Sequence, residues 1–331
     1  SSVIPAPGAW SIPGTKHMFR DSVRSGHGSA NLSKAIQVSS DTFFYRLGFE
    51  MGIEKIRPYL AEFDFGQQTG IDLPNEYRGV LPSPEWKEKR FSKLPPERRR
   101  WNTAEMVPIS IGQGYNAYTP LQMAHATATL ANNGVVYRPH LVKELLDHNK
   151  QQITLIDPKP QRILPFKQSN FNYVKAAMAK VLQPGGTARK IGVGLKYSMG
   201  GKTGTAQVVQ IAQGKNYNAA ALAEQHRDHA WFIAFAPMEK PQIAIAVILE
   251  NGGWGANAAP LARGLSDYYL LKLKSGGDHD IPVDNRNKTG VENPLLAGSG
   301  TVRPSENKIT EAFRTIHNPE AAHSAASEAA P

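Results

Sequence analysis

Apolar residues recur at helical spacing in several segments of the first two thirds of the chain. Residues 31–37 and 41–51 carry this pattern, and a short polar break separates them. A clearer helix is predicted from Thr119, because threonine is a favoured N-cap and the proline that follows it suits the first helical position. Another helical pattern runs from Phe171 to Leu182 and stops before a Pro-Gly-Gly turn.

Strand patterns follow in the last third of the chain. Residues 201–209 are rich in Thr and Val, and residues 229–236 and 243–250 are mainly apolar and end at Pro or Asn-Gly-Gly. The short connection between the last two strands is typical of an antiparallel hairpin. Residues 258–273 predict a closing helix. This order predicts a mixed α/β fold of the α+β type, with an antiparallel sheet flanked by helices.

The composition changes sharply after Lys274. Residues 274–331 are rich in small and polar residues and show no sustained apolar period, so we expect a disordered tail. Residues 1–273 are then expected to form one folded domain, because their number suits a single domain.

The bulk composition excludes several classes of protein. The chain has 331 residues, 40% of them hydrophobic, which is enough for a sizeable core. No stretch approaches the roughly 18 uninterrupted apolar residues of a membrane-spanning helix. Cysteine is absent, which excludes disulfides and thiolate metal sites.

A formal net charge of +10 raises the question of nucleic-acid binding. Much of the excess lies within EWKEKRFSKLPPERRRW, residues 85–101. We interpret this segment as a solvated loop and expect no nucleic-acid partner, because no nucleic-acid motif accompanies the charge. A positive surface facing anionic envelope polymers or lipid head groups is the other interpretation.

The strongest local signal for chemistry is Gly-Gly-Lys-Thr-Gly-Thr-Ala-Gln, which opens the first predicted strand. Glycines such as Gly204 let a ligand or another backbone approach closely. Lys202 and the hydroxyls of Thr203 and Thr205 are suited to hold a carboxylate, and a free backbone N–H on this edge is suited to an oxyanion. Lys-Thr-Gly occurs again at residues 288–290 without a strand pattern, and we interpret that copy as chance.

A second element, Ser39-Ser40-Asp41, lies in the break between the first two predicted helices. Taken alone, such a triplet is most often a helix N-cap. Taken with the Lys202 strand, it matches the pairing of Ser-x-Asn or Ser-x-Asp with Lys-Thr-Gly in penicillin-binding proteins and serine β-lactamases.

The chain resembles the class B penicillin-binding proteins, and among them the elongation-type group that supports rod shape. Seven blocks carry the resemblance in the right order: Gly26-His27-Gly28; Ser39 to Tyr45; Phe65-Gly66 with Thr69 to Leu73; Glu85 to Lys87 with Lys89 to Phe91; Gly112 to Tyr115 with Thr119 to Gln122; Lys202 to Gln207; and Arg227 to His229 with Phe235 to Pro237 and Leu249 to Gly253. It implies the penicillin-binding, β-lactamase-like transpeptidase fold and acyl transfer through a serine ester.

The resemblance also implies roles for individual residues. Ser39 would relay a proton and Asp41 would position the network. Lys202, Thr203 and Thr205, with Gly204 between them, would bind the terminal carboxylate of a D-Ala-D-Ala stem peptide or of a β-lactam. The Thr205 backbone N–H would contribute to the oxyanion hole.

The nucleophile of such enzymes comes from a Ser-x-x-Lys motif N-terminal to the Ser39 triplet, and residues 1–39 contain none. Ser305 to Lys308 has the spacing but lies in the tail, after the strand, and we interpret it as chance. We therefore expect the nucleophile and its lysine upstream of Ser1, and this chain to be a fragment of an enzyme. The resemblance further implies an upstream inner-membrane anchor, a periplasmic domain and a membrane glycosyltransferase partner.

Some relatives resembling this group hold zinc near the triplet with two Asp, a His and a Cys. Asp21 and His27 match two of these ligands, but Ala6 and Ser40 stand at the other two positions. Two ligands do not make a structural zinc site, so we expect no metal, and the resemblance implies no cofactor.

Three alternatives remain open at this point. A β-lactamase or D,D-carboxypeptidase on the same fold would pass the ester to water, and product analysis would separate it from a transpeptidase. A non-catalytic penicillin-recognition or scaffold protein would lack the nucleophile altogether. A basic nucleic-acid binder would show affinity that falls steeply with salt.

Overall fold

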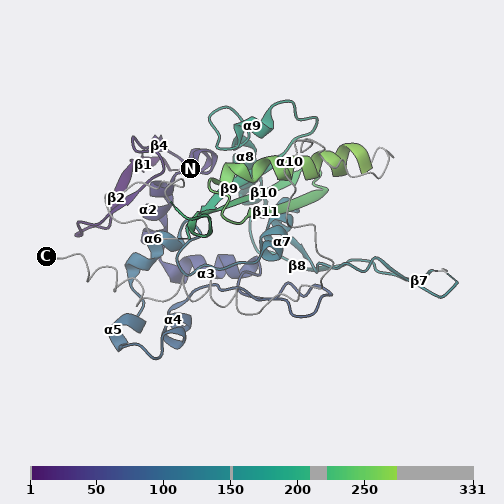
Figure 1. Cartoon of the computed structure of the whole chain (residues 1–331), viewed down its shortest axis with the longest axis horizontal. Coiled ribbons are helices and arrows are strands. Elements are labelled where there is room, and N and C mark those ends of the chain that lie inside the picture. Colours follow the sequence, from purple (N-terminus) through teal and green to yellow (C-terminus); the bar gives the residue numbers. More distant parts are fainter. Residues whose placement is uncertain (1, 150–151, 209–221, 274–331) are drawn as a thin grey trace.

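A three-stranded antiparallel sheet lies at the centre of the molecule (Figure 1). The structure is a computed structural model that describes residues 2–149, 152–208 and 222–273. Strand β9 spans Gly200–Ala206, β10 His229–Ala236 and β11 Ile243–Leu249. The strand order is β11-β10-β9, with Lys202 opposite Ile233 and Thr205 opposite Ala230. Strand β9 is therefore an edge strand, paired to β10 on one side.

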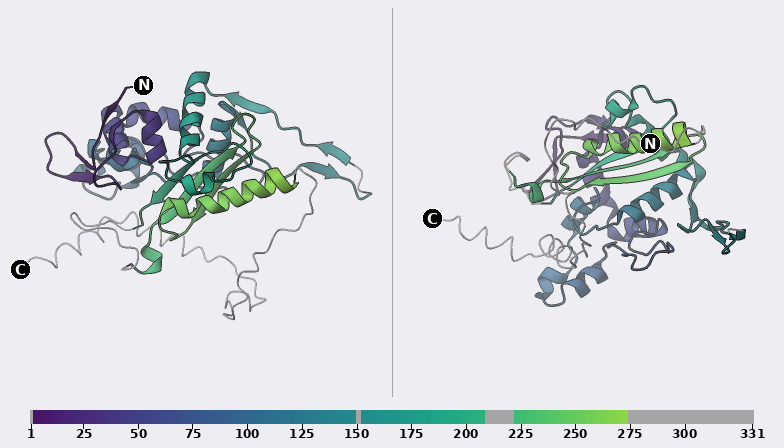
Figure 2. Two further views of the ribbon diagram at one scale, coloured as in Figure 1. Left: turned by 90° about the horizontal axis from the view of Figure 1, so that it is seen from above. Right: turned by 45° about the vertical axis from the view of Figure 1, so that its right-hand side comes forward.

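Helices cover both faces of this sheet, as Figure 2 shows from two further directions. Helix α10 (Ala259–Asp267) lies along one face and continues into a π-helical segment, Tyr268–Leu273. Helices α7 (Pro120–Ala131) and α8 (Gln168–Lys180) pack against the other face.

The alternation of side chains along β10 explains these two layers. Phe232 packs in the cluster that contains Ala262 of α10, whereas Phe235 packs with Ala131 and Met178 of α7 and α8. Successive strand residues point to opposite faces, and both rings are fully buried. Burial of each ring stabilises the fold by about 1.5–3 kcal/mol relative to exposure.

Local side-chain bonds set the beginnings of several helices. Thr119 and Gln122 form a capping box, in which each side chain accepts from the other's backbone N–H at 3.1 and 3.0 Å. The Asn31 side chain accepts from Lys34 N at 2.9 Å and begins α1 (Leu32–Val38).

The remaining helices are short or lie further from the sheet. Their bounds are α2 Asp41–Met51, α3 Ile53–Glu62, α4 Pro84–Arg90, α5 Pro96–Arg99, α6 Met106–Ile109 and α9 Arg189–Gly192, with 3-10 turns at Thr103–Glu105, Glu224–His226 and Gly255–Asn257.

The other strands of the described residues form two-stranded antiparallel ribbons. The pairs are β1 (Ile4–Ala6) with β4 (Gly28–Ala30), β2 (Ala9–Ser11) with β3 (Met18–Arg20), β5 (Val135–Tyr137) with β8 (Pro160–Ile163), and β6 (Glu144–Leu146) with β7 (Gln152–Leu155). The β6–β7 ribbon projects away from the body in Figure 1.

The predicted antiparallel sheet with flanking helices is confirmed. The loop predicted for residues 85–101 is wrong, because α4 and α5 form there, although most charged side chains of the segment are exposed as predicted. Lys87 is buried, donates to the Arg100 carbonyl at 2.7 Å and pairs with Glu105.

The predicted tail, residues 274–331, lies outside the described residues, together with its Lys-Thr-Gly copy and its Ser-x-x-Lys spacing. Among the helices that the structure describes, none has the length and apolar character to cross a membrane.

Candidate active site

Glycines allow the edge strand β9 to pack tightly at both ends. A Cβ on Gly201 would lie 2.6 Å from the Phe232 ring, far inside van der Waals contact. A Cβ on Gly255 would overlap the carbonyl oxygen of Gly204, so the loop after β11 closes directly onto the strand. The close backbone approach expected at Gly204 is therefore present.

Ser39 occupies the break between α1 and α2, as the hydrophobic pattern predicted. Its φ of 56° lies in the left-handed region, which costs a non-glycine residue about 1 kcal/mol. Lys202 Nζ donates to Ser39 Oγ at 2.7 Å and to the Thr203 carbonyl at 2.7 Å. The fold thus joins two motifs that are 163 residues apart in the sequence.

Asp41 and Lys202 have opposite charges and shifted pKa values. Burial and the nearby Asp21 carboxylate raise the pKa of Asp41 to about 7, although Lys202 and the Ser22 backbone N–H act against the rise. Burial lowers the pKa of Lys202 to about 8, and the Asp41 charge opposes that fall. Both groups therefore titrate close to neutral pH, as groups at active sites often do.

The two strand threonines keep hydroxyl hydrogens for a ligand. Thr203 Oγ1 shares one hydrogen bond with Thr187 Oγ1 at 2.7 Å, so the pair retains one free O–H. Thr205 Oγ1 accepts from the Gly255 N–H at 3.0 Å, which leaves the Thr205 hydroxyl as a donor. Gln113 Nε2 donates to the Thr205 carbonyl at 3.1 Å and holds this end of the strand.

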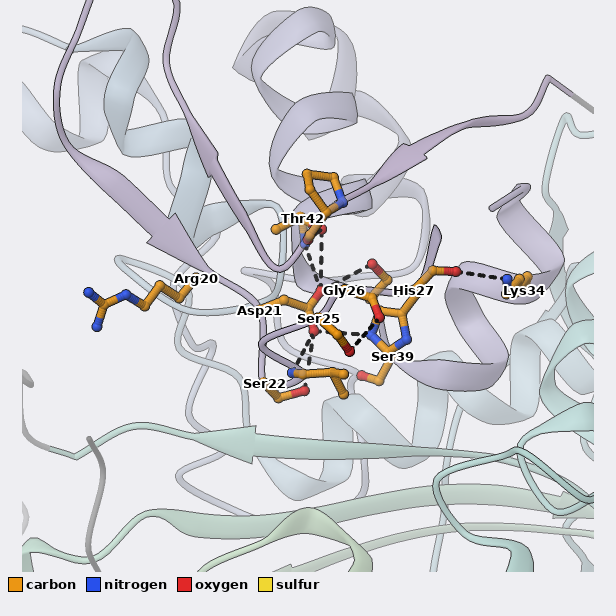
Figure 3. A network of polar contacts seen from close by, with 12 residues as sticks. Arg20, Asp21, Ser22, Ser25, Gly26, His27, Lys34, Ser39 and Thr42 are labelled. Carbon is orange, nitrogen blue, oxygen red and sulfur yellow. Dashed lines mark hydrogen bonds and ion pairs between the residues drawn. The ribbon is translucent and has the colours of Figure 1, made fainter. Parts of the chain in front are cut away.

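The middle residue of the triplet, Ser40, is fully buried. It stands at the N-cap position of α2 but makes no capping bond, so the simple N-cap interpretation does not apply to its hydroxyl. Its Oγ donates to Asp21 Oδ2 at 3.1 Å. Figure 3 shows the Asp21 carboxylate among its partners, with Thr42 and His27 pointing toward it.

These contacts bear on the zinc site that some relatives resembling this group hold. Asp21 and His27 do lie together, with 3.1 Å between Asp21 Oδ1 and His27 Nε2. Ala6 offers no ligand, Ser40 uses its hydroxyl as a donor, and no group of three or more metal-binding side chains occurs in the described part of the chain. The residues present do not fit zinc.

We predict a zinc-to-protein ratio near zero after purification and dialysis against micromolar zinc, measured by mass spectrometry of metals. Hydrogen bonds already occupy both oxygens of Asp21. A ratio near one, abolished in a His27→Ala variant, would contradict the prediction.

The sequence missed several residues of the site. Thr187 follows a Gly-Gly pair and reaches Thr203, and Gln113 lies within a Gly-Gln-Gly block that the resemblance already used. Asp21 was considered as a metal ligand and not as the acceptor that it is. Of the residues that the sequence did predict, Ser39, Lys202 and Asp41 come together.

Comparisons with known proteins agree with this geometry. Residues 4–267 match the family "Penicillin binding protein transpeptidase domain". Peptidoglycan D,D-transpeptidase MrdA of Acinetobacter baumannii is 45% identical over 83% of this chain and 39% of its own length.

Solved structures agree as well. PBP2 of Pseudomonas aeruginosa in complex with WCK 5153 has a TM-score of 0.68 at 38% identity, over 82% of this chain and 56% of that one. PBP2 of Helicobacter pylori in complex with MreC has a TM-score of 0.66 at 35% identity, over 82% and 45%.

The chain spans about two fifths of the length of the curated relatives that it matches. The family match nevertheless covers most of the residues that the structure describes, including the Ser39 triplet and the Lys202 strand. The chain belongs to the penicillin-binding protein transpeptidase family, as a member of its elongation-type class B group.

Proposed function

We propose that this chain is the C-terminal part of the transpeptidase domain of a serine-type peptidoglycan D,D-transpeptidase, which crosslinks stem peptides during cell elongation and is acylated by β-lactams. The hydrogen bond from Lys202 to Ser39 carries the proposal, because it joins the two motifs that such an enzyme needs on opposite sides of its substrate. The nucleophilic serine and its lysine come from a segment upstream of Ser1.

Acylation begins when the upstream lysine takes the proton of the upstream serine. The serine oxygen attacks the carbonyl between the two terminal D-alanines, and the backbone N–H of Thr205 and that of the nucleophile stabilise the oxyanion. Lys202 and the hydroxyls of Thr203 and Thr205 bind the terminal carboxylate, with Thr203 donating to it while accepting from Thr187. The C–N bond then breaks, and Ser39 relays the proton held by the upstream lysine to the departing D-alanine amine, which leaves that lysine neutral again.

Deacylation gives the crosslink. An amine of a second stem peptide attacks the carbonyl of the serine ester and loses its proton to the lysine. The bond from the carbonyl to the serine oxygen breaks as the new amide forms, and the lysine returns the proton to the serine oxygen. Asp41 holds the charge of Lys202 near the Ser39 hydroxyl throughout.

The setting of the enzyme is part of the proposal. We place the domain on the periplasmic face of the inner membrane, held by an upstream anchor and working beside a membrane glycosyltransferase. The Helicobacter pylori PBP2 structure is a complex with MreC, which supports the existence of a protein partner here, while the glycosyltransferase remains a proposal from the resemblance.

Labelling with a fluorescent penicillin tests the proposal. This chain and one extended upstream through the next Ser-x-x-Lys motif are incubated with the reagent, and the adduct is mapped by mass spectrometry. We expect an adduct on the upstream serine of the longer protein and none on residues 1–331. An adduct within residues 1–331, or none in either protein, would contradict the nucleophile assignment.

A further inference from the structure

The Asp21 carboxylate lies directly after β3 and is fully buried. A buried carboxylate needs partners, because transfer of an unpaired charge out of water is very unfavourable. Oδ1 accepts from Val23 N at 3.1 Å and lies 3.1 Å from His27 Nε2. Oδ2 accepts from Ser40 Oγ at 3.1 Å and from Thr42 N at 3.2 Å.

These partners come from two segments that are distant in the sequence. Val23 and His27 belong to the loop between β3 and β4, whereas Ser40 and Thr42 belong to the start of α2. Asp21 therefore ties this loop to the residues on both sides of Asp41.

The two segments also interact through backbone N–H groups. The Thr42 N–H donates to the Asp21 carboxylate at 3.2 Å, and the Ser22 N–H lies near enough to the Asp41 carboxylate to oppose the rise of its pKa. Together with the bond from Ser40 to Asp21, these interactions hold the turn that contains Asp41. The Thr42 hydroxyl donates to the Pro7 carbonyl at 2.7 Å, which fastens the same turn to the end of β1.

Ser39 directly precedes this fastened segment. Its left-handed backbone is held from the C-terminal side by Ser40, which is fully buried against Asp21. Any loosening of Ser40 and Thr42 moves Ser39 Oγ relative to Lys202 Nζ, which are 2.7 Å apart.

We propose that Asp21, oriented by His27, is a positioning residue of the acylation reaction, and that its hydrogen bonds hold the Ser39–Asp41 turn in place. The inference rests on the proposed function. The hydrogen bonds of Asp21 go to the β3–β4 loop and to the start of α2, so it acts through Asp41 and Ser39.

The Asp21 charge also acts on Asp41 through space. It is one of the causes that raise the pKa of Asp41 to about 7. The other titratable groups that face the pair are His27 from the β3–β4 loop, Lys202 from β9 and Tyr45 from α2. Removal of the Asp21 charge should therefore lower the pKa of Asp41. A variant that only loosened the packing would not lower that pKa.

The test uses the protein extended upstream through its Ser-x-x-Lys motif, with Asp21→Asn as the variant. Asparagine keeps the shape and one acceptor oxygen but removes the charge. We expect the rate of penicillin acylation at pH 7.5 to fall about 10- to 100-fold, as displaced catalytic groups do. The acid limb of the pH–rate profile, and the Asp41 carboxyl signal in NMR of ¹³C-aspartate-labelled protein, should both move to lower pH. Asp157→Asn, at an exposed position, should change neither.

The outcomes separate this inference from the proposed function. No acylation of the unsubstituted protein would overturn the function, and the NMR titration would still decide whether Asp21 acts on Asp41. An unchanged rate in Asp21→Asn, or a slower rate with an unmoved acid limb and an unmoved Asp41 signal, would overturn the inference.

Discussion

Replacement of Lys202 by alanine should lower the rate of penicillin acylation of the complete protein at least about 100-fold, the effect of removing one essential charged or oxyanion-stabilising donor. Among the cations of the described site, the Lys202 ammonium lies nearest to Ser39. It donates to Ser39 Oγ at 2.7 Å. Alanine removes both the attraction for the substrate carboxylate and the partner that orients the Ser39 hydroxyl. Stopped-flow or gel-based acylation rates measure the change.

The control for this prediction is Lys190→Ala, which removes one positive charge from an exposed position on α9. It should acylate normally, so that a general effect of net charge is excluded. The unsubstituted protein supplies a further check. Because the pKa of Lys202 is about 8, its cation is lost as the pH rises through that value, and acylation should decline there. Near-normal acylation of Lys202→Ala would refute the assignment.

The sequence predicted the central sheet because its strands are continuous and local. Strand β10 runs from His229 to Ala236, the bounds that the apolar pattern gave. The juxtaposition of Ser39 and Lys202 was also predictable, although only from the resemblance, because no periodicity relates two positions so far apart.

Other parts of the fold carry little local signal. The strands β1 to β4 have three residues each, too few for an alternating pattern to stand out. Helix α4 was mistaken for a loop because most of its residues are charged, and its buried residue is itself a lysine, so the sequence shows no apolar side. Lys87 is buried there since its ammonium meets Glu105 and the Arg100 carbonyl, and that compensation is visible only in three dimensions.

The Asp21 network was hidden for a related reason. Buried polar networks are specified by tertiary distances, so a short acidic residue in a loop gives no sign of how many donors surround it. The sequence placed Asp21 and His27 near the triplet through the zinc comparison, but it gave no indication that Ser40 and Thr42 would donate to Asp21.

Asp41 is expected to oppose the stability of the fold at neutral pH. The pKa of Asp41 is raised from 3.8 to about 7. Ionisation of Asp41 therefore lowers the free energy of unfolding by at most about 4 kcal/mol. Between pH 4 and pH 7 the folded protein retains a proton on Asp41 that the unfolded chain has released. The stability contributed by Asp41 is therefore complete below pH 4, falls as the pH rises and is lost above about pH 7.

Asp41→Asn should thus be more stable and less active at once. At pH 8 we expect the melting temperature to rise by up to about 10 °C, because asparagine avoids the buried charge and keeps an acceptor for the Ser22 N–H. At pH 5 the gain should shrink to less than half of that value, because Asp41 is protonated in the folded protein and largely ionised in the unfolded chain, while Asp157→Asn should show no gain at either pH. Acylation at pH 8 should fall, since Lys202 loses the anion that supports its charge and its pKa drops further. A melting temperature that does not rise at pH 8, or rises equally at both pH values, would show that Asp41 is not a strained, ionisable group of the site.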